Sequence, residues 1–394
     1  MTPLAVTAFT ATTAVGAGND ALLAALIDGR SGLRPNDFTS HPLPTWIGRV
    51  NGVESIDWPD DFARWECRNN RLAWLGLQSD GFMEAVRNAR ARHGANRIAL
   101  VIGTSTSSIG ATEEAYSRLE LDGQFPADLR RPEVHTPHSL GDFVAHALQL
   151  DGPCVTVATA CSSSAKVFAQ AERMMRLGLV DAAVVGGVDT LCGSVIFGFN
   201  SLELVSAQPC KPFDISRNGL SLGEAAGFAL LERDGPAAAW LIGHGESSDA
   251  HHMSSPHPEG LGARSALQAA LARAGLEAAA VDYVNLHGTA SQKNDEVEAA
   301  MVADLFPASA AASSTKGWTG HTLGAAGVVE AVVCLLAIRH GFRPGTLNTQ
   351  TLDPVCGPQL RLRSEHRPVN VALTESFGFG GNNCVLVFAD RATP

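Results

Sequence analysis

The chain has 394 residues, 45% of them hydrophobic, with 39 Gly, 20 Pro and 8 Cys. This composition is typical of an α/β protein with an ordered core and excludes disorder, and the length allows two large domains or one duplicated unit. The net charge of −11, with no stripe of Lys and Arg, argues against nucleic acid as a partner but leaves room for a local basic patch.

Cysteine usage and the apolar segments indicate the compartment. The cysteines form no CxxC pair, so we expect neither disulfides nor a zinc site, no other metal, and a reducing, cytoplasmic setting. Residues 1–8 lack a basic n-region and a long apolar core, so they predict a first strand rather than a signal peptide. No segment carries an uninterrupted apolar run of about 18 residues, and we therefore expect no membrane span.

Strand-like and helical segments alternate along the chain. Continuous apolar runs predict strands, and a periodicity of about 3.6 residues predicts helices. Strands are expected over residues 1–8, 97–103, the start of 153–165, 181–188, 281–287 and 370–374, and helices over residues 166–175, 294–305 and 328–336. Apolar strands between helices indicate sheets covered on both faces. Residues 36–70, rich in Pro, Trp and Arg, predict a surface excursion rather than core.

A weak internal repeat indicates two related halves. Residues 154–188 follow the pattern strand, small-residue turn, helix, Gly, strand, and residues 313–341 contain a similar pattern. The junction is expected near residues 232–240, which gives an N-terminal half of residues 1–235 and a C-terminal half of residues 236–394.

Cys161 lies where a β-branched run turns, through small residues, into the predicted helix 166–175. A thiol at a helix N-terminus feels the positive end of the macrodipole and unpaired N–H groups, which favour the thiolate and could also hold an oxyanion. The alternative is a buried core cysteine. The small residues around Cys161 favour the nucleophile, because they leave space for a substrate.

Two histidines have Gly and hydroxyl neighbours. His287 ends an apolar strand, and His321 lies in the Gly-rich segment 313–327. Each is suited to donate a hydrogen bond or carry a proton, although either alone would more often be structural. Lys316 either tunes His321 or is a surface lysine.

Two carboxylates follow His287 at the start of the helix expected over residues 294–305. Asp295 and Glu298 either compensate the helix dipole or, for Glu298, form a buried carboxylate that orients the region of Lys316.

The segment 375–383 is rich in Gly and Asn. Such a backbone needs positive φ or approaches a ligand closely, unless it is only a turn-rich loop. Phe377 and Phe379 alternate with Gly378 and Gly380, which indicates a mobile aromatic gate beside a pocket.

Together these motifs resemble the β-ketoacyl-acyl-carrier-protein synthases of the Cys-His-His type, in family order over most of the chain. The matching motifs are Thr159–Ser163, His287–Thr289, Lys316 with Gly320–Gly327, Gly378–Asn383, Asp249–Gly260, and Pro212–Asp214 with Gly219 and Gly223–Glu224. The resemblance implies an α/β thiolase-like fold of two pseudo-duplicated halves in five α-β-α-β-α layers. It also implies a homodimer, or a heterodimer with a related ketosynthase-like subunit, and no cofactor.

The resemblance further implies a decarboxylative Claisen condensation of malonyl-acyl carrier protein with an acyl chain held on Cys161. His287 and His321 would promote decarboxylation and stabilise the enolate, with Lys316 and Glu298 in support. The N–H groups of Cys161 and Phe379 would form the oxyanion hole. The further site residues implied are Thr289 and Asn383 as supporting residues, and Phe379, Phe377 and Ile109 as the gate and acyl pocket.

The acidic carrier protein would dock on a basic surface. The candidate residues for this surface are Arg64, Arg68, Arg71, Arg130 and Arg131. The alternative is scattered, solvated arginines.

Three other questions stay open. Ala225, Ser254, Ala290 and Ser291 depart from the commoner family residues, so a specialised polyketide or aryl-polyene-type pathway stands beside fatty-acid synthesis. A second hypothesis is a non-catalytic, chain-length-factor-like partner subunit, which usually lacks the nucleophile. A third is a thiolase-like CoA enzyme, but Cys384 does not lie in the C-terminal cysteine motif of thiolases.

Overall fold

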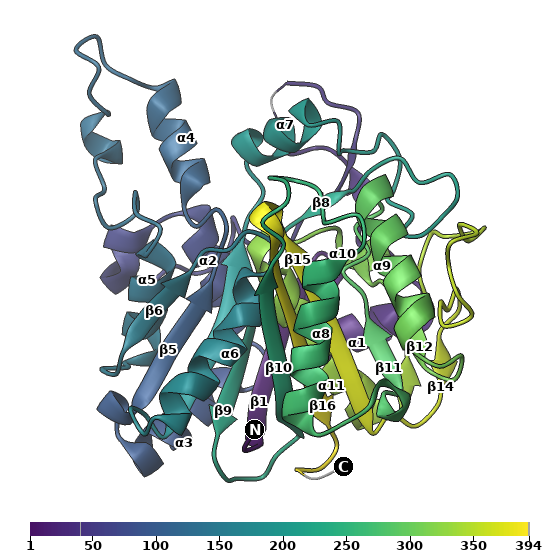
Figure 1. Ribbon diagram of the computed structural model, residues 1–394. Coiled ribbons are helices and arrows are strands. Elements are labelled where there is room, and N and C mark those ends of the chain that lie inside the picture. The colour runs from purple at the N-terminus through teal and green to yellow at the C-terminus, as the bar shows by residue number, and fades with distance from the viewer. Residues whose placement is uncertain (40, 393–394) are drawn as a thin grey trace.

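The computed structural model describes residues 1–39 and 41–392, and within these ranges the central feature is a mixed sheet of 11 strands (Figure 1). Its first half contains β1 (Leu4–Thr13), β5 (Ile98–Gly103), β6 (Cys154–Val157), β7 (Ala182–Asp189) and β9 (Ala225–Glu232), and the short β2 (Gly16–Ala17) pairs with β1. Its second half contains β10 (Ala239–Ser248), β11 (Tyr283–Asn285), β12 (Ala311–Ser313), β15 (Val371–Gly378) and β16 (Asn382–Ala389).

The two halves of the sheet repeat one topology. The strand order is β1-β9-β7-β5-β6 in the first half and β10-β16-β15-β11-β12 in the second. In each half the first three strands are antiparallel to their neighbours, and the last two are parallel to the third. The halves join where β1 pairs antiparallel with β10. The predicted division between residues 235 and 236 falls between β9 and β10 and stays a prediction.

Helices cover both halves of the sheet and fill the space between them. Helices α6 (Ser163–Arg176) and α11 (Ala326–His340) contact strands of both halves and share one hydrophobic core with them. Helices α2 (Arg68–Leu77), α3 (Phe82–His93) and α5 (Ser139–Leu148) cover the outer face of the first half, and α8 (Leu261–Ala274) and α9 (Gln292–Leu305) that of the second. The predicted α-β-α-β-α arrangement is confirmed.

Shorter elements border this core. They are α1 (Asn19–Asp28), α4 (Ile109–Ser117), α7 (Gly193–Ser201), α10 (Lys316–Thr319), the small sheet of β3 (Arg34–Pro35), β4 (Trp46–Gly48) and β8 (Leu222–Gly223), and the pair β13 (Phe342–Arg343) and β14 (Glu365–His366). Figure 1 shows α4 and the loop after it projecting from the body of the protein.

The apolar character of α11 follows from its place between the two halves of the sheet. The segment Leu323–His340 is long and apolar enough to cross a membrane by length and composition, and 83% of it is buried inside the protein. A helix enclosed on all sides needs apolar residues all round, as α11 has.

The predicted surface excursion at residues 36–70 is wrong in part. Val50, Val53, Phe62 and Trp65 are buried in the outer core of the first half, where Phe62 and Trp65 pack edge-on against Phe143 of α5. Leaving such large aromatic rings in contact with water would be unfavourable in free energy. The rings are therefore buried, although the neighbouring prolines favour turns. Residue 40 of this segment lies outside the described residues.

The contact between α6 and α11 gives a stability prediction. A Cβ atom at Gly327 would lie 2.5 Å from the backbone nitrogen of Ala165 and 2.7 Å from its Cβ. We expect Gly327→Ala to destabilise the protein by about 1–3 kcal/mol in urea unfolding. Gly198→Ala in α7 is the control, because nothing lies within 4 Å of the added Cβ, and it should be neutral or stabilising. Equal losses in both variants would contradict the crowding argument.

Candidate active site

Cys161 lies in the turn between β6 and α6, as the sequence predicts. The turn passes through positive φ at Ala160 (52°), and α6 begins at Ser163. The hydroxyl of Ser163 donates to the carbonyl of Ala160 and accepts from the N–H of Thr159, which holds the turn closed. Cys161 itself is only 4% exposed.

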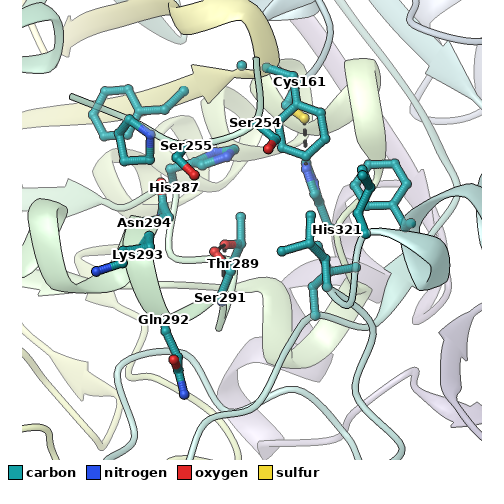
Figure 2. Close-up of a pocket in the computed structure, with 18 of the residues that line it drawn as sticks. Cys161, Ser254, Ser255, His287, Thr289, Ser291, Gln292, Lys293, Asn294 and His321 are labelled. Atoms are coloured by element: carbon teal, nitrogen blue, oxygen red, sulfur yellow. Dashed lines mark hydrogen bonds between the residues drawn. The ribbon is translucent and has the colours of Figure 1, made fainter. Parts of the chain in front are cut away.

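Both predicted histidines meet Cys161 where the two halves face each other. The Nε2 atom of His321 lies 3.0 Å from the Cys161 sulfur, and the rings of His287 and His321 are 5.4 Å apart and perpendicular (Figure 2). His287 follows β11 and His321 follows α10, so the imidazoles come from the second half and the thiol from the first.

Asp189, at the end of β7, fixes the His321 loop to the first half. Its carboxylate accepts hydrogen bonds from the Gly324 N–H at 2.6 Å and from the backbone and hydroxyls of residues 104–106. Sequence reasoning missed Asp189. The signal available was an acidic residue directly after an apolar strand.

The partner of Lys316 corrects a sequence-based expectation. Lys316 is buried, pairs with Glu330 of α11, and donates to the carbonyl of His287. We expected Glu298 to orient the Lys316 region. Its carboxylate instead accepts hydrogen bonds from the backbone N–H groups of His287, at 2.6 Å, and Gly288, at 2.7 Å. Glu330 was missed, although it is a lone acid inside an apolar helical run.

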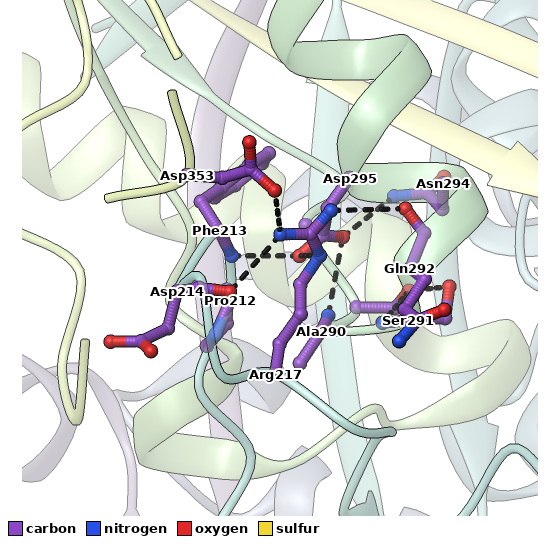
Figure 3. A network of polar contacts seen from close by, with 12 residues as sticks. Pro212, Phe213, Asp214, Arg217, Ala290, Ser291, Gln292, Asn294, Asp295 and Asp353 are labelled. Carbon is purple, nitrogen blue, oxygen red and sulfur yellow. Dashed lines mark hydrogen bonds and ion pairs between the residues drawn. The ribbon is translucent and has the colours of Figure 1, made fainter. Parts of the chain in front are cut away.

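Asp295 is buried and binds backbone groups of neighbouring loops, so it is not a surface residue that only compensates the helix dipole (Figure 3). Its carboxylate accepts from the N–H groups of Phe213 at 2.7 Å and Ala290 at 3.2 Å. Arg217 lies 3.9 Å from Asp295 and pairs with Asp353 at 2.6 Å. Burial raises the pKa of Asp295 to about 6, although the hydrogen bonds and Arg217 oppose this shift.

Burial sets the protonation of the central groups. It raises the pKa of the Cys161 thiol to about 12, although the charge of Lys316 and the N–H of Phe379 act in the other direction. The expectation that the helix N-terminus makes Cys161 a thiolate is therefore wrong, because burial destabilises the thiolate by more than the helix N-terminus stabilises it. Burial and Lys316 also lower the pKa values of His287 and His321 well below the usual range, so both imidazoles are neutral at pH 7.

A cavity of about 420 Å³ leads to the thiol. Cys161 and both histidines lie on its wall, together with polar residues, which in Figure 2 are Ser254, Ser255, Thr289, Ser291, Gln292, Lys293 and Asn294. The hydroxyls of Thr289 and Ser291 are 2.9 Å apart. A volume of this size accommodates an extended small ligand.

The Gly-Phe-Gly segment forms another wall of this cavity. Phe379 stacks on Phe199 of α7 with 5.5 Å between ring centroids, and the Phe377 ring lies 5.8 Å from that of His287. The predicted positive φ is found at Gly380 and Gly381. Asn383 also lines this cavity, and its amide donates to Ser247 and Asp249, which connects the segment to the end of β10 and the residue after it.

Ile109 lies apart from the three central side chains. It begins α4, is 41% exposed, and is not among the described residues that line the cavity of Cys161.

The five candidate docking arginines are not one free basic surface. Arg68 pairs with Glu224 and Glu54, Arg71 with Glu66, and Arg130 with Glu120. Arg131 donates to two backbone carbonyls, and Arg64 stacks on the ring of Trp65 at 3.9 Å.

The same three central side chains also have ligand atoms of metal-binding type. Their Sγ and ring nitrogen atoms lie within 4.8 Å of one another. Metal-bound imidazoles usually donate their second N–H to a carboxylate or carbonyl. The Nδ1 atoms of His287 and His321 have no such partner among the described residues, so the set fits a resident metal poorly.

Comparisons with known proteins identify the family of the chain. Residues 1–237 match the family model of the β-ketoacyl synthase N-terminal domain, and residues 238–350 match that of the C-terminal domain. Nodulation protein E of Rhizobium meliloti (strain 1021) is 34% identical over 304 residues, which cover 74% of this chain and 75% of that protein. The 3-oxoacyl-[acyl-carrier-protein] synthase 2 of Coxiella burnetii is 30% identical over 401 residues, 93% of each chain.

A solved structure resembles almost the whole chain. A chain of the complex of the ketosynthase ApeO with its chain length factor ApeC, from Xenorhabdus doucetiae, matches with a TM-score of 0.91 and 36% identity, and the match covers 99% of this chain and 98% of that one. The chain has the same layered architecture, two family models that together span residues 1–350, and a thiol facing two neutral imidazoles. It therefore belongs to the β-ketoacyl synthase family of acyltransferases.

Proposed function

We propose that the protein is a 3-oxoacyl-acyl-carrier-protein synthase in which Cys161 carries the acyl chain, working in fatty-acid synthesis or in a specialised polyketide or aryl-polyene-type pathway. The observation that carries the assignment is the contact of 3.0 Å between Cys161 Sγ and His321 Nε2, beside His287 in one cavity.

The first step is acyl transfer to Cys161. The sulfur attacks the thioester carbonyl of the acyl carrier protein, and the thiol proton passes through His321 to the departing carrier thiol. The negative charge on the carbonyl oxygen is stabilised by the N–H groups of Cys161 and Phe379, and the latter already points at the sulfur.

The second step joins the two chains. The malonyl thioester loses CO₂, the electrons of the broken C–C bond form an enolate, and its oxygen accepts hydrogen bonds from neutral His287 and His321. The carbanion attacks the acyl carbonyl, the C–S bond breaks, and Cys161 leaves as a thiolate that then takes up a proton. Lys316 supports this step by holding the carbonyl of His287.

We infer a second ketosynthase-like subunit, identical or related, on the side of the first half where its sheet ends. Within the described ranges β6 pairs with β5 alone, so its other edge is free to pair. Nearby, α4 and the loop after it expose the apolar side chains of Tyr116, Leu119 and Leu121. The acyl carrier protein is the second partner. All eight cysteines are free thiols, which supports a cytoplasmic setting.

Separate half-reactions test the roles of Cys161 and His287. We expect Cys161→Ala to reduce acyl loading by at least about 1,000-fold while malonyl decarboxylation persists, and His287→Ala to impair decarboxylation while loading persists. Loading is read by intact mass spectrometry and decarboxylation by CO₂ release. Cys67→Ala is the control, because Cys67 is also a buried thiol before a helix (α2). An unmodified protein that performs neither half-reaction would instead be a non-catalytic, chain-length-factor-like subunit.

Substitutions at the ion pair of Lys316 and Glu330 distinguish a role of Lys316 in catalysis from a role in stability. Lys316→Met leaves the Glu330 carboxylate buried without its cation and should destabilise the protein by about 3 kcal/mol in urea unfolding. Lys316→Met/Glu330→Met removes both charges and should regain most of that stability while decarboxylation stays impaired. If the double variant also regains decarboxylation, Lys316 serves the fold alone.

Charge reversal tests the docking surface. We expect Arg64→Glu/Arg131→Glu to raise the KM for the carrier protein by roughly threefold or more at low salt, and the difference should shrink as salt screens the charges. Arg87→Glu is the control, because Arg87 is exposed on α3, at the opposite end of the first half from α4 (Figure 1). Equal KM values in the two variants would remove these arginines from the docking surface.

A further inference from the structure

Glu375 is a buried carboxyl that the proposed reaction does not use. It lies on β15, is 0% exposed, and no N–H or O–H group of the described residues donates to either of its oxygens. Burying a carboxylate without donors is very costly, so the group must either find a cation or keep its proton.

The other buried acids of the site have partners that Glu375 lacks. Glu330 pairs with Lys316, and Asp295 lies near Arg217 and accepts two backbone N–H groups. Glu330 and Asp295 therefore each have a cation nearby. The ionisable group that interacts with Glu375 is instead another acid, the carboxyl of Glu298.

The hydrogen bonds of Glu298 decide which carboxyl of the pair is protonated. One Glu298 oxygen accepts from the N–H of His287, and the other accepts from the N–H of Gly288 and the amide of Asn294. Both oxygens are thus committed as acceptors, which favours the ionised form of Glu298. Burial acts in the other direction and, together with Asp295, raises the pKa of Glu298 to about 7, although the N–H groups and Lys316 lower it. Glu375 is equally buried and has, among the described residues, neither a donor nor a cation to oppose that rise. The proton that a buried pair of carboxyls must retain therefore belongs on Glu375.

We propose that Glu375 is a positioning residue: as a neutral carboxylic acid it donates a hydrogen bond to Glu298 and thereby fixes Glu298 beneath the backbone of His287. The proposal rests on the proposed role of His287. When rising pH removes this proton, two adjacent carboxylates repel each other, Glu298 shifts, and the His287–Gly288 backbone moves with it. Decarboxylation then falls, whereas acyl loading at Cys161, which the first half carries, is affected less.

The pH profile of malonyl decarboxylation tests this role. Glu375→Gln keeps a neutral donor that cannot ionise, so its rate at neutral pH should stay within about threefold, and its alkaline fall should move up by at least about one pH unit. Glu375→Leu removes the donor and should lower decarboxylation by about tenfold with little change in acyl loading. The control is Glu232→Gln, a buried glutamate on β9 that pairs with Arg92, and its alkaline fall should match the unmodified protein.

Two readouts do not depend on activity. The infrared difference spectrum between the unmodified protein and Glu375→Gln at neutral pH should contain the C=O band of a protonated carboxylic acid. Burial beside Glu298 raises the pKa of Glu375, so its contribution to stability is complete below the ordinary carboxyl pKa and is lost as the pH rises through the folded value. Glu375→Gln should therefore lose less stability than the unmodified protein on going to alkaline pH.

The outcomes separate the two hypotheses. An absent carboxylic-acid band, or an unchanged alkaline fall in Glu375→Gln, would overturn the role of Glu375. Equal losses of loading and decarboxylation in Glu375→Leu would overturn it too, because the residue would then serve the fold as a whole. If the unmodified protein shows the band but does not decarboxylate malonyl thioesters, the proposed role of His287 is wrong and the shared proton remains.

Discussion

The thiol and the imidazoles of the site belong to different halves of the chain, and the contact between α6 and α11 brings them together. Gly327 of α11 lies against Ala165 of α6, and the N–H of Val328 donates to the hydroxyl of Ser164 at 2.9 Å. Cys161 precedes α6 and His321 precedes α11, so the distance between the reacting atoms depends on how closely these two helices cross. Side chains larger than glycine at this crossing would separate sulfur from nitrogen.

Dehydration is the second constraint, because it decides what each group of the site can do. A buried thiol and two buried imidazoles stay uncharged at pH 7, so the histidines can donate hydrogen bonds to a developing enolate. The charges that remain nearby are arranged as compensated sets, such as Lys316 with Glu330. Lys316 also donates a hydrogen bond to the carbonyl of His287. The same side chain therefore compensates a buried charge and positions the backbone of a site residue.

Periodicity and short motifs in the sequence predict the strands, the turn of Cys161 and the two histidines. The layered fold was predicted from the family resemblance that the motifs carry. Glu330, Asp189 and Glu375 were missed, since their importance lies in partners more than ten residues away that only packing reveals. The same reason explains the error on the thiol: the helix N-terminus is local and readable, whereas desolvation is a property of the whole fold. The rings of residues 36–70 were misjudged because composition alone does not show which face they cover.

The pairing of β1 has a consequence for how the protein is made. One edge of β1 pairs with β10 over residues 4–6, and the other edge pairs with β9 from Ala5 to Thr12. Apart from the two-residue β2, β1 therefore has no sheet partner among the described residues until β9 and β10 have been synthesised, and folding of the sheet is dominated by contacts distant in sequence. Until then the apolar face of β1 stays exposed, so this segment is open to aggregation for longer during synthesis than a strand that pairs with its sequence neighbours.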